Sequence, residues 1–476
     1  MTEVALLWLR NDLRVTDHAA WQWATEHNVA MVPVYIHAPD EATDWPPGSA
    51  SQWWLQHSLQ SLQHDIEQRG GRLIVRRGSS AETILSLARE TRATHVYWQR
   101  THEPSLRKRY DYVANVLRAS GINCHINEPL LHAPAKLLKS DGTPYRVFTP
   151  FFRVWEKQLL LSAPLSPPAA LSAISTSIPS LNLDELQLAP PHRWHKKLAR
   201  HWQPGEQTAL TRLDTVATSL ASAYERDRDV PAIDGTARLS AALHFGELSP
   251  QQVYWALLHN QTDPEKSHAL RRQLAWREFA HYVLWHFPHT SDEPMDIRFK
   301  QFPWRTNSAH LLRAWQRGQT GIPIVDAGMR QLWESGWMHN RVRMIAASFL
   351  TKHCRIPWQE GARWFWETLV DADLANNSMG WQWVAGCGVD AAPYFRVFSP
   401  LRQSEKFDAA GDYIARWVPE LARLPPAYRH APWQLPSQVA AQIDFRLGRD
   451  YPAPIVDLER ERQAALDAYK SIKSGR

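Results

Sequence analysis

The chain has 476 residues, enough for two or three domains with a substantial buried core. Lysine and arginine number 54 against 48 aspartates and glutamates, and the net charge of +6 mildly favours a polyanionic partner, although an ordinary solvated surface is the commoner cause of such an excess. The three cysteines form no CxxC pair, so neither a disulfide framework nor a metal site is indicated. No segment approaches the roughly 20 apolar residues of a membrane span, and no signal-peptide pattern opens the chain. We expect a cytoplasmic protein that does not bind membranes.

The first 130 residues alternate short apolar runs with helical patterns. The predicted strands are residues 4–9, 31–37, 72–77, 94–98 and 122–127. The predicted helices between them include residues 51–69, 80–92 and 104–119. This alternation predicts a doubly wound, mostly parallel α/β sheet in a domain of residues 1–130. GxGxxG and GxxxxGK[ST] loops are missing, but a nucleotide-like ligand could still bind at the strand ends.

The sequence after residue 130 predicts a connector followed by helices. Residues 131–204 form the predicted interdomain connector, because 159–192 are rich in Leu, Ser, Ala and Pro. Amphipathic patterns then predict an all-α domain of residues 205–476. Its clearest predicted helices are residues 266–286, 308–318, 323–335, 338–353, 360–370 and 457–474.

Three stretches carry more polar and aromatic side chains than packing alone explains. Thr236, Arg238 and Ser240 could hold a diphosphate at a helix start, although an ordinary capped helix gives the same pattern. Gln273 and Trp276 share a helix face, as a surface Gln beside a core Trp also would. Residues 336–344 and 371–377 form the third stretch. Its Arg343, Asp371 and Asp373 could clamp a cofactor or form a structural salt bridge, and spacing does not separate these alternatives.

Taken together, these motifs resemble the photolyase and cryptochrome family of blue-light flavoproteins over nearly the whole chain. Residues 8–14 resemble the family's opening motif W-[FL]-R-x-D-L-R. The matching motifs of the helical part are residues 235–240, 276–279, 321–330, 336–341, 373–377, 381–383 and 390–396. The resemblance is greatest to bacterial cyclobutane pyrimidine dimer photolyases of the class I type.

The resemblance implies that the helical domain holds FAD. The implied contacts are Tyr224, Thr236, Arg238, Leu239, Ser240, Arg277, Trp337, Asn340, Arg343, Asp371, Asp373 and Asn377. Asn377 would face the flavin N5, where plant-type cryptochromes carry Asp. An amide cannot donate a proton as an acid does, which fits an enzyme that keeps FAD fully reduced.

The resemblance also implies damaged DNA, double- or single-stranded, as the partner of a monomeric enzyme. Photolyases for the (6-4) lesion place His where Asn340 and Met344 stand, so the cyclobutane dimer is favoured. The implied DNA contacts are Gln273, Trp276, Asn340, Arg341, Met344, Trp383, Arg396 and Gln403. Gln273 departs from the family, because dimer-specific members usually have Glu there, and we expect reduced efficiency. The lesion would be extruded from the duplex, as the general behaviour of photolyases requires.

Three tryptophans, Trp304, Trp358 and Trp381, align with the family's electron relay from the surface to FAD. With Asn377 and Gln273 they form the expected catalytic set. Around residues 102–104 only Glu103 resembles a folate-binding residue, so a folate, a deazaflavin or no antenna chromophore all stay open.

Two other readings compete with repair. A cryptochrome-type photoreceptor would share the flavin and the tryptophans, but such proteins usually carry a long C-terminal extension, and only residues 409–476 follow the last motif. A plain flavin redox protein leaves Trp276 and Trp383 unexplained.

Overall fold

The computed structural model describes residues 3–41, 44–171, 177–188, 193–260, 263–391 and 395–474. The chain divides into two compact units. The first unit comprises Met1–Ser222 and Ala237–Pro288, and the second comprises Ala223–Thr236 and His289–Arg476.

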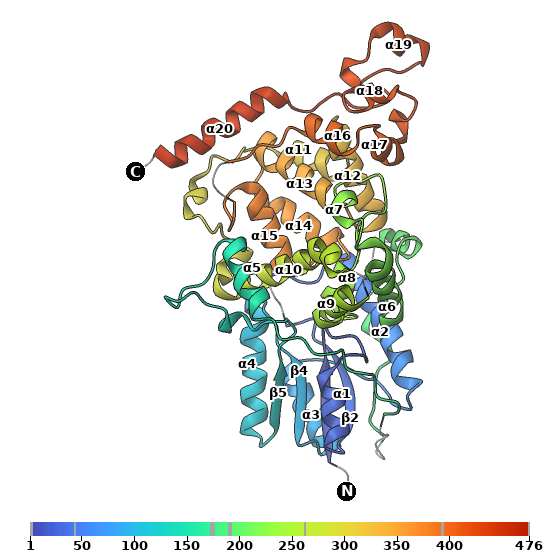
Figure 1. Cartoon of the computed structure of the whole chain (residues 1–476), viewed down its shortest axis with the longest axis vertical. Helices are drawn as coiled ribbons and strands as arrows, with labels where there is room; N and C mark the ends of the chain where they lie inside the picture. Colours follow the sequence, from blue (N-terminus) through green and yellow to red (C-terminus); the bar gives the residue numbers. More distant parts are fainter. Residues whose placement is uncertain are drawn as a thin grey trace. The chain divides into compact units, whose positions relative to one another are not determined.

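The first unit contains one five-stranded sheet (Figure 1). Its strands are β1 (Val4–Leu9), β2 (Ala30–His37), β3 (Ile74–Arg77), β4 (His95–Gln99) and β5 (Asn123–Asn127). They are ordered β3-β2-β1-β4-β5, and every neighbouring pair is parallel. The predicted doubly wound α/β sheet is therefore confirmed, with small differences at the strand ends.

Helices supply the crossovers that parallel strands need. They are α1 (Ala19–Glu26), α2 (Ser49–Glu67), α3 (Ser80–Thr91) and α4 (Pro104–Ala119). Three of them were predicted, whereas α1 was not, because its 8 residues are too few for a clear helical period.

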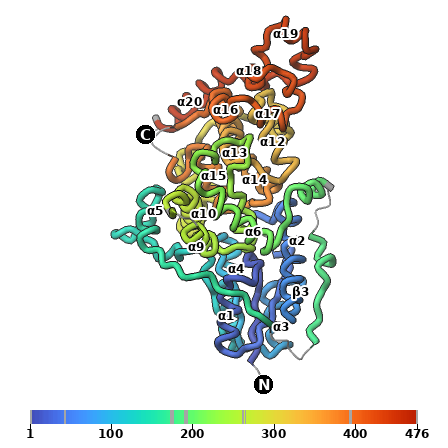
Figure 2. The backbone as a smooth tube through the Cα atoms, turned by 45° about the vertical axis from the view of Figure 1, so that its right-hand side comes forward, coloured from blue at the N-terminus to red at the C-terminus, as the bar shows by residue number. Residues whose placement is uncertain are grey.

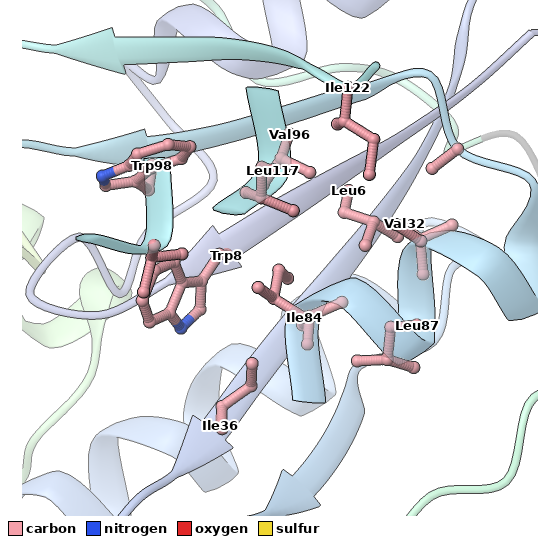
Figure 3. Close-up of a cluster of buried hydrophobic side chains, with 14 of the residues drawn as sticks. Leu6, Trp8, Val32, Ile36, Ile84, Leu87, Val96, Trp98, Leu117 and Ile122 are labelled. Carbon is pink, nitrogen blue, oxygen red and sulfur yellow. The ribbon is translucent and has the colours of Figure 1, made fainter. Parts of the chain in front are cut away.

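Both faces of this sheet are covered, which explains why its central strands β1 and β2 are almost wholly apolar and buried. On one face Leu6, Trp8 and Val96 pack with Ile84 of α3 and Leu117 of α4 (Figure 3). On the other face Trp23 of α1 meets Tyr97 and His125 at ring-centroid distances of 4.8 and 5.1 Å.

Residues 159–171 and 177–188 contain no α-helix, as their composition indicated, whereas the earlier part of the predicted connector forms the helix α5 (Phe148–Lys157). Leu171 N donates to Arg69 O at 2.8 Å and Leu181 N donates to Val75 O at 3.0 Å. The segment therefore runs along the α/β layer, which the tube in Figure 2 makes visible. The later helices of the first unit are α5 (Phe148–Lys157), α6 (Glu206–Thr215), α8 (Ser240–Phe245), α9 (Pro250–His259) and α10 (His268–His286).

The second unit is helical, and the extended pairing in its described residues is an isolated bridge between Leu447 and Tyr451. Its helices are α7 (Tyr224–Asp227), α11 (Ala309–Gln316), α12 (Pro323–Ser335), α13 (Asn340–Ser348), α14 (Trp358–Thr368), α15 (Leu374–Ala385), α16 (Pro400–Phe407), α17 (Asp412–Trp417), α18 (Pro426–Arg429), α19 (Ser437–Gln442) and α20 (Leu458–Ser474). The helix predicted at 338–353 begins at Asn340 and ends in a π-helical turn, η8 (Phe349–His353). None of the helices in the described ranges is long and apolar enough to cross a bilayer.

Candidate functional site

A buried turn sets the start of α13 in the second unit. Gly336 ends α12 in a left-handed conformation (φ 67°), which a glycine adopts without steric cost. Gln331 Oε1 then accepts from His339 N at 3.2 Å and from the Tyr413 hydroxyl at 2.7 Å. His339 caps α13, because its Nδ1 accepts from Arg341 N at 3.2 Å. Burial lowers the pKa of His339 to about 4, so the ring is neutral and can act as an acceptor.

Arg343 and Asp371 meet, as one reading of the sequence expected. Arg343 Nε donates to Met338 O at 2.7 Å, and its Nη2 lies 3.1 and 2.9 Å from the two Asp371 oxygens. The Asp371 side chain is 4% exposed and that of Arg343 is 22% exposed. Asp373 caps α15 instead, accepting from Asn376 N at 2.8 Å. The predicted trio is therefore a salt bridge beside a helix cap.

The Asn377 amide is held in one orientation. Its Nδ2 donates to Ala362 O of α14 at 3.0 Å, while its backbone N donates to Asp373 O at 2.8 Å. Because a carbonyl can only accept, the atom facing Ala362 must be the amide nitrogen. The Asn377 Oδ1 therefore points away from α14.

Trp381 packs directly on α14. Its indole is 3% exposed and lies 5.0 Å from the ring of Phe365. A Cβ added to Gly361 would lie 2.1 Å from Trp381 Cη2, so only glycine permits this approach. Trp358 begins α14 one turn before Gly361 and is 1% exposed. Two of the three predicted relay tryptophans, Trp358 and Trp381, are therefore both positioned by α14.

Trp304 lies nearer the surface. Its ring is partly exposed and stands 4.5 Å from the ring of Phe302. The next residue, Arg305, donates its backbone N–H to Arg355 O at 2.8 Å, in the loop that leads into α14. Trp304 is thus partly exposed, whereas Trp381 and Trp358 are both buried.

The second unit also carries most of the predicted DNA contacts. Asn340 and Met344 are neighbours on α13, with Asn340 Nδ2 3.9 Å from Met344 Sδ. Trp383 Nε1 donates to Asp390 O at 3.1 Å and keeps part of its ring exposed. Arg396 is exposed, and Gln403 on α16 is partly exposed.

Arg341 is engaged within the second unit. Its Nη2 lies 2.7 Å from Asp229 Oδ2, and its guanidinium stands 4.4 Å from the centroid of Phe407. Asp229 compensates the charge that was expected to face a DNA phosphate. The salt bridge thus reduces the net positive charge that Arg341 can present to a DNA phosphate.

In the first unit, α10 presents the predicted aromatic and polar face. Trp276 stacks on Phe148 with centroids 3.6 Å apart and planes 9° apart. Gln273 Nε2 donates to Ala269 O at 3.4 Å, a long bond within the same helix. Arg277 Nη2 donates to Leu243 O at 3.2 Å.

The predicted diphosphate segment divides between the units. Tyr224, a buried residue that begins α7, and Thr236 belong to the second unit, whereas Arg238, Leu239 and Ser240 belong to the first. Arg238 adopts a left-handed conformation (φ 53°) two residues before the start of α8. In the second unit a Cβ on Gly235 would lie 2.6 Å from Asp227 O, so this turn requires glycine.

Several buried polar atoms have no hydrogen-bond partner among the described residues. Those of predicted site residues or their sequence neighbours include Arg277 Nη1 in the first unit and Ser378 Oγ and Trp381 Nε1 in the second. Buried polar groups in native proteins nearly always have partners, so such atoms fit places where a polar ligand supplies them. Within the described ranges, His, Cys, Asp and Glu form no group of three suited to a metal ion.

Glu278 and Lys352 are among the buried ionisable residues to which the sequence assigned no role. Glu278, beside Arg277, accepts from Leu131 N at 3.2 Å and His132 N at 3.4 Å, and burial raises its pKa to about 7. Lys352, in η8, is 1% exposed, and burial lowers its pKa well below the usual value. Its Nζ donates to Ala385 O at 2.7 Å, at the C-terminal end of α15.

Comparison with known proteins supplies the family. The family model described as DNA photolyase matches residues 5–170, and the FAD binding domain of DNA photolyase matches residues 270–471. A deoxyribodipyrimidine photo-lyase of Agrobacterium fabrum is 42% identical over 99% of this chain and 98% of its own length. Cryptochrome-1 of Arabidopsis thaliana is 32% identical over 98% of this chain and 70% of its own length.

Among solved structures, a bacterial class III photolyase from Agrobacterium tumefaciens superimposes with a TM-score of 0.94. The two sequences are 41% identical, and the match covers 99% of this chain and 98% of that one. The class I-like part of the expectation thus has weak support, because this relative is of class III. The broader expectation is confirmed: the chain belongs to the DNA photolyase family.

Proposed function

We propose that this protein is a deoxyribodipyrimidine photo-lyase, which repairs cyclobutane pyrimidine dimers in DNA when it absorbs light. The observation that carries the proposal is the Asn340–Met344 pair at the start of α13, with an amide and a thioether 3.9 Å apart. Neither group exchanges a proton near neutral pH. Dimer splitting requires an electron to be delivered and returned, so such a surface fits this chemistry better than a lesion that needs acid and base.

FAD, when bound and reduced, supplies the electron that light makes available. The residues that would hold it are Tyr224, Thr236, Arg238, Leu239, Ser240, Arg277, Trp337, Asn340, Arg343, Asp371, Asp373 and Asn377. The partnerless Arg277 Nη1 and Ser378 Oγ support the fit, since both are donors that need an acceptor. Asp371 orients Arg343, and Ala362 orients Asn377.

Trp381, Trp358 and Trp304 would return FAD to its reduced form by passing electrons inward from the surface. The partial exposure of Trp304, with Trp381 and Trp358 buried, and the close packing of Trp381 on α14 support this direction. The relay would operate only in photoreduction, because repair itself starts from the reduced cofactor.

The residues that would contact DNA are Gln273, Trp276, Asn340, Arg341, Met344, Trp383, Arg396 and Gln403. The partly exposed rings of Trp276 and Trp383 suit stacking on an extruded lesion. Gln273 keeps its Oε1 as an acceptor, since its Nε2 faces Ala269 O. Arg396 would hold a flanking phosphate.

The division into an antenna domain (1–130), a connector (131–204) and a catalytic domain (205–476) is also proposed. The first of these would bind a second chromophore, a folate or a deazaflavin, if the enzyme carries an antenna at all. We further propose that the enzyme is a cytoplasmic monomer acting on double- or single-stranded damaged DNA.

Purification followed by absorption spectroscopy and illumination with a thymine-dimer oligonucleotide tests the proposal. Flavin bands with light-dependent loss of the dimer are expected, and an additional near-ultraviolet or blue band would identify an antenna. Intact flavin without repair would contradict the proposal. It would then favour a cryptochrome-type photoreceptor, the alternative supported by the similarity to cryptochrome-1.

A further inference from the structure

The side chain of Lys352 joins the end of α15 to a phenylalanine further along the chain. Lys352 is 1% exposed and lies in η8, the turn that follows α13. Its Nζ donates to Ala385 O at 2.7 Å and stands 3.1 Å from the centroid of the Phe395 ring. Both contacts use N–H groups, which the amine carries whether or not it is charged. One buried amine therefore connects Ala385 with Phe395.

Gly386 permits the close approach around this amine. It ends α15 in a left-handed conformation (φ 87°). A Cβ on residue 386 would lie 3.0 Å from Phe395 Cδ2 and 3.3 Å from Lys352 Nζ, so a larger residue would press against both. The Phe395 ring also stacks on Tyr469 of α20, with centroids 4.4 Å apart. The ring is therefore held by the amine as well as by the C-terminal helix.

Arg396 follows this anchored ring directly. A second anchor comes two residues later, where Phe398 donates its backbone N–H to Ser348 Oγ at 3.3 Å. Ser348 is the last residue of α13 and is 2% exposed. Arg396 and Val397 lie between the two anchored phenylalanines, and Arg396 is exposed. The backbone position of Arg396 is thus set by contacts with α13 and η8.

The other end of the link carries Trp383. This residue lies two positions before Ala385 in α15, and its Nε1 donates to Asp390 O at 3.1 Å. Asp390 follows the helix in a left-handed conformation (φ 54°). Trp383 and Arg396, both proposed to contact DNA, therefore lie on either side of the two residues that Lys352 joins.

We propose that Lys352 is a positioning residue for DNA recognition. It fixes the separation between Trp383, which would stack on the lesion, and Arg396, which would hold a flanking phosphate. The inference rests on the proposed function, because it takes both residues as DNA contacts. A lysine that only stabilised the fold would leave the salt dependence of DNA binding unchanged. A lysine that positions Arg396 would change it, because each phosphate contact adds to that dependence.

Lys352→Met removes the amine and leaves an apolar, flexible chain to fill the space. The matched control is Lys300→Met, which removes an amine whose side chain is 44% exposed and paired with Glu293. Binding of the holoenzyme to a duplex with a cyclobutane dimer is measured by fluorescence anisotropy at several salt concentrations. In Lys352→Met the slope of log affinity against log salt should be smaller by about 0.9, an eightfold loss of affinity at 0.1 M relative to 1 M salt. Lys300→Met should keep the wild-type slope.

The double variant Lys352→Met/Arg396→Gln tests whether Lys352 acts through Arg396. Residues that share one contact are not additive, so the double variant should have the same slope as Arg396→Gln alone. Slopes that decrease additively would overturn the proposal. A wild-type slope in Lys352→Met would also overturn it, and so would an equal decrease in Lys300→Met.

Phe395→Leu is the second variant, which keeps the amine and removes the ring that it contacts. It should reproduce the smaller slope with FAD still bound, as flavin absorbance verifies. If Lys352→Met does not fold, a wild-type slope in Phe395→Leu overturns the proposal. Light-dependent dimer repair by the wild-type enzyme tests the proposed function separately, because that measurement involves no change at Lys352 or Phe395.

Discussion

Trp381 lies so close to Gly361 that a Cβ on residue 361 would come within 2.1 Å of the indole. Gly361→Ala should therefore displace Trp381. Overpacking of this kind costs about 1–3 kcal/mol. We expect a lower melting temperature and slower photoreduction of FAD, measured by thermal denaturation and by absorbance under illumination.

Gly380→Ala is the matched control for that variant. Gly380 also lies in a helix, α15, but no atom lies within 4 Å of its added Cβ. Alanine in a helix interior stabilises by roughly 0.5–1 kcal/mol relative to glycine. Equal melting temperatures and photoreduction rates in the two variants would show that a methyl group at residue 361 does not displace the Trp381 indole.

Arg343→Lys should weaken FAD retention. A lysine has no planar fork, so it cannot hold Met338 O and Asp371 together as Arg343 does. The expected result is faster FAD loss on dilution, followed by flavin fluorescence. Arg363→Lys is the control, because Arg363 pairs with Glu360 at 3.8 Å on an exposed surface, where such pairs contribute about 0–1 kcal/mol. Equal FAD loss from both variants would contradict this role for Arg343.

Acid should destabilise the turn that starts α13. The pKa of His339 falls from 6.5 to about 4 on folding, chiefly through burial, so the unfolded chain binds the proton more tightly. Its contribution to stability is therefore present above pH 6.5 and is lost as the pH falls toward 4. The full loss amounts to roughly 3 kcal/mol at 1.36 kcal/mol per pKa unit.

His339→Asn is the variant that isolates this effect. Asparagine preserves a side chain that can cap α13 but cannot titrate. Denaturant unfolding at several pH values should give a shallower loss of stability between pH 6.5 and 4 in the variant. Parallel pH profiles for both proteins would mean that His339 is not the group responsible.

Gln273→Glu should raise the repair yield. The Gln273 amide bonds weakly to its own helix at 3.4 Å, so a carboxyl group can replace it without breaking a strong contact. A carboxyl group can supply a proton to the dimer, which an amide cannot. The quantum yield of dimer loss should increase, and an unchanged yield would remove position 273 from the repair chemistry.

Arg396→Gln should flatten the salt dependence of binding to damaged DNA. Each phosphate contact contributes about 0.9 to the slope of log affinity against log salt. Fluorescence anisotropy at several salt concentrations should show a slope smaller by about that amount. Arg226→Gln is the control, because Arg226 is 80% exposed but paired with Asp227. An equal reduction of the slope in both variants would contradict a phosphate contact by Arg396.

The sheet and most long helices could be predicted because their apolar residues recur with the period of a strand or of a helix. The ends of α12, for example, are marked by Pro323 and Gly336. Most site residues were predicted from the family resemblance. The spacing of residues alone could not separate a cofactor clamp from the Arg343–Asp371 ion pair. Asp229, which pairs with Arg341, could not be foreseen, because that contact joins residues 112 positions apart. Lys352 was missed because its neighbours in the sequence do not show that its amine donates to Ala385 O, at the C-terminal end of α15.

The most direct test of the central claim compares two lesions under one light dose. Chemically reduced enzyme is illuminated with oligonucleotides that carry either a cyclobutane thymine dimer or a (6-4) photoproduct, beside dark controls. We predict light-dependent loss of the cyclobutane dimer alone, because Asn340 and Met344 provide neither acid nor base. Loss of neither lesion by flavin-loaded enzyme would contradict the account, and so would repair of the (6-4) photoproduct.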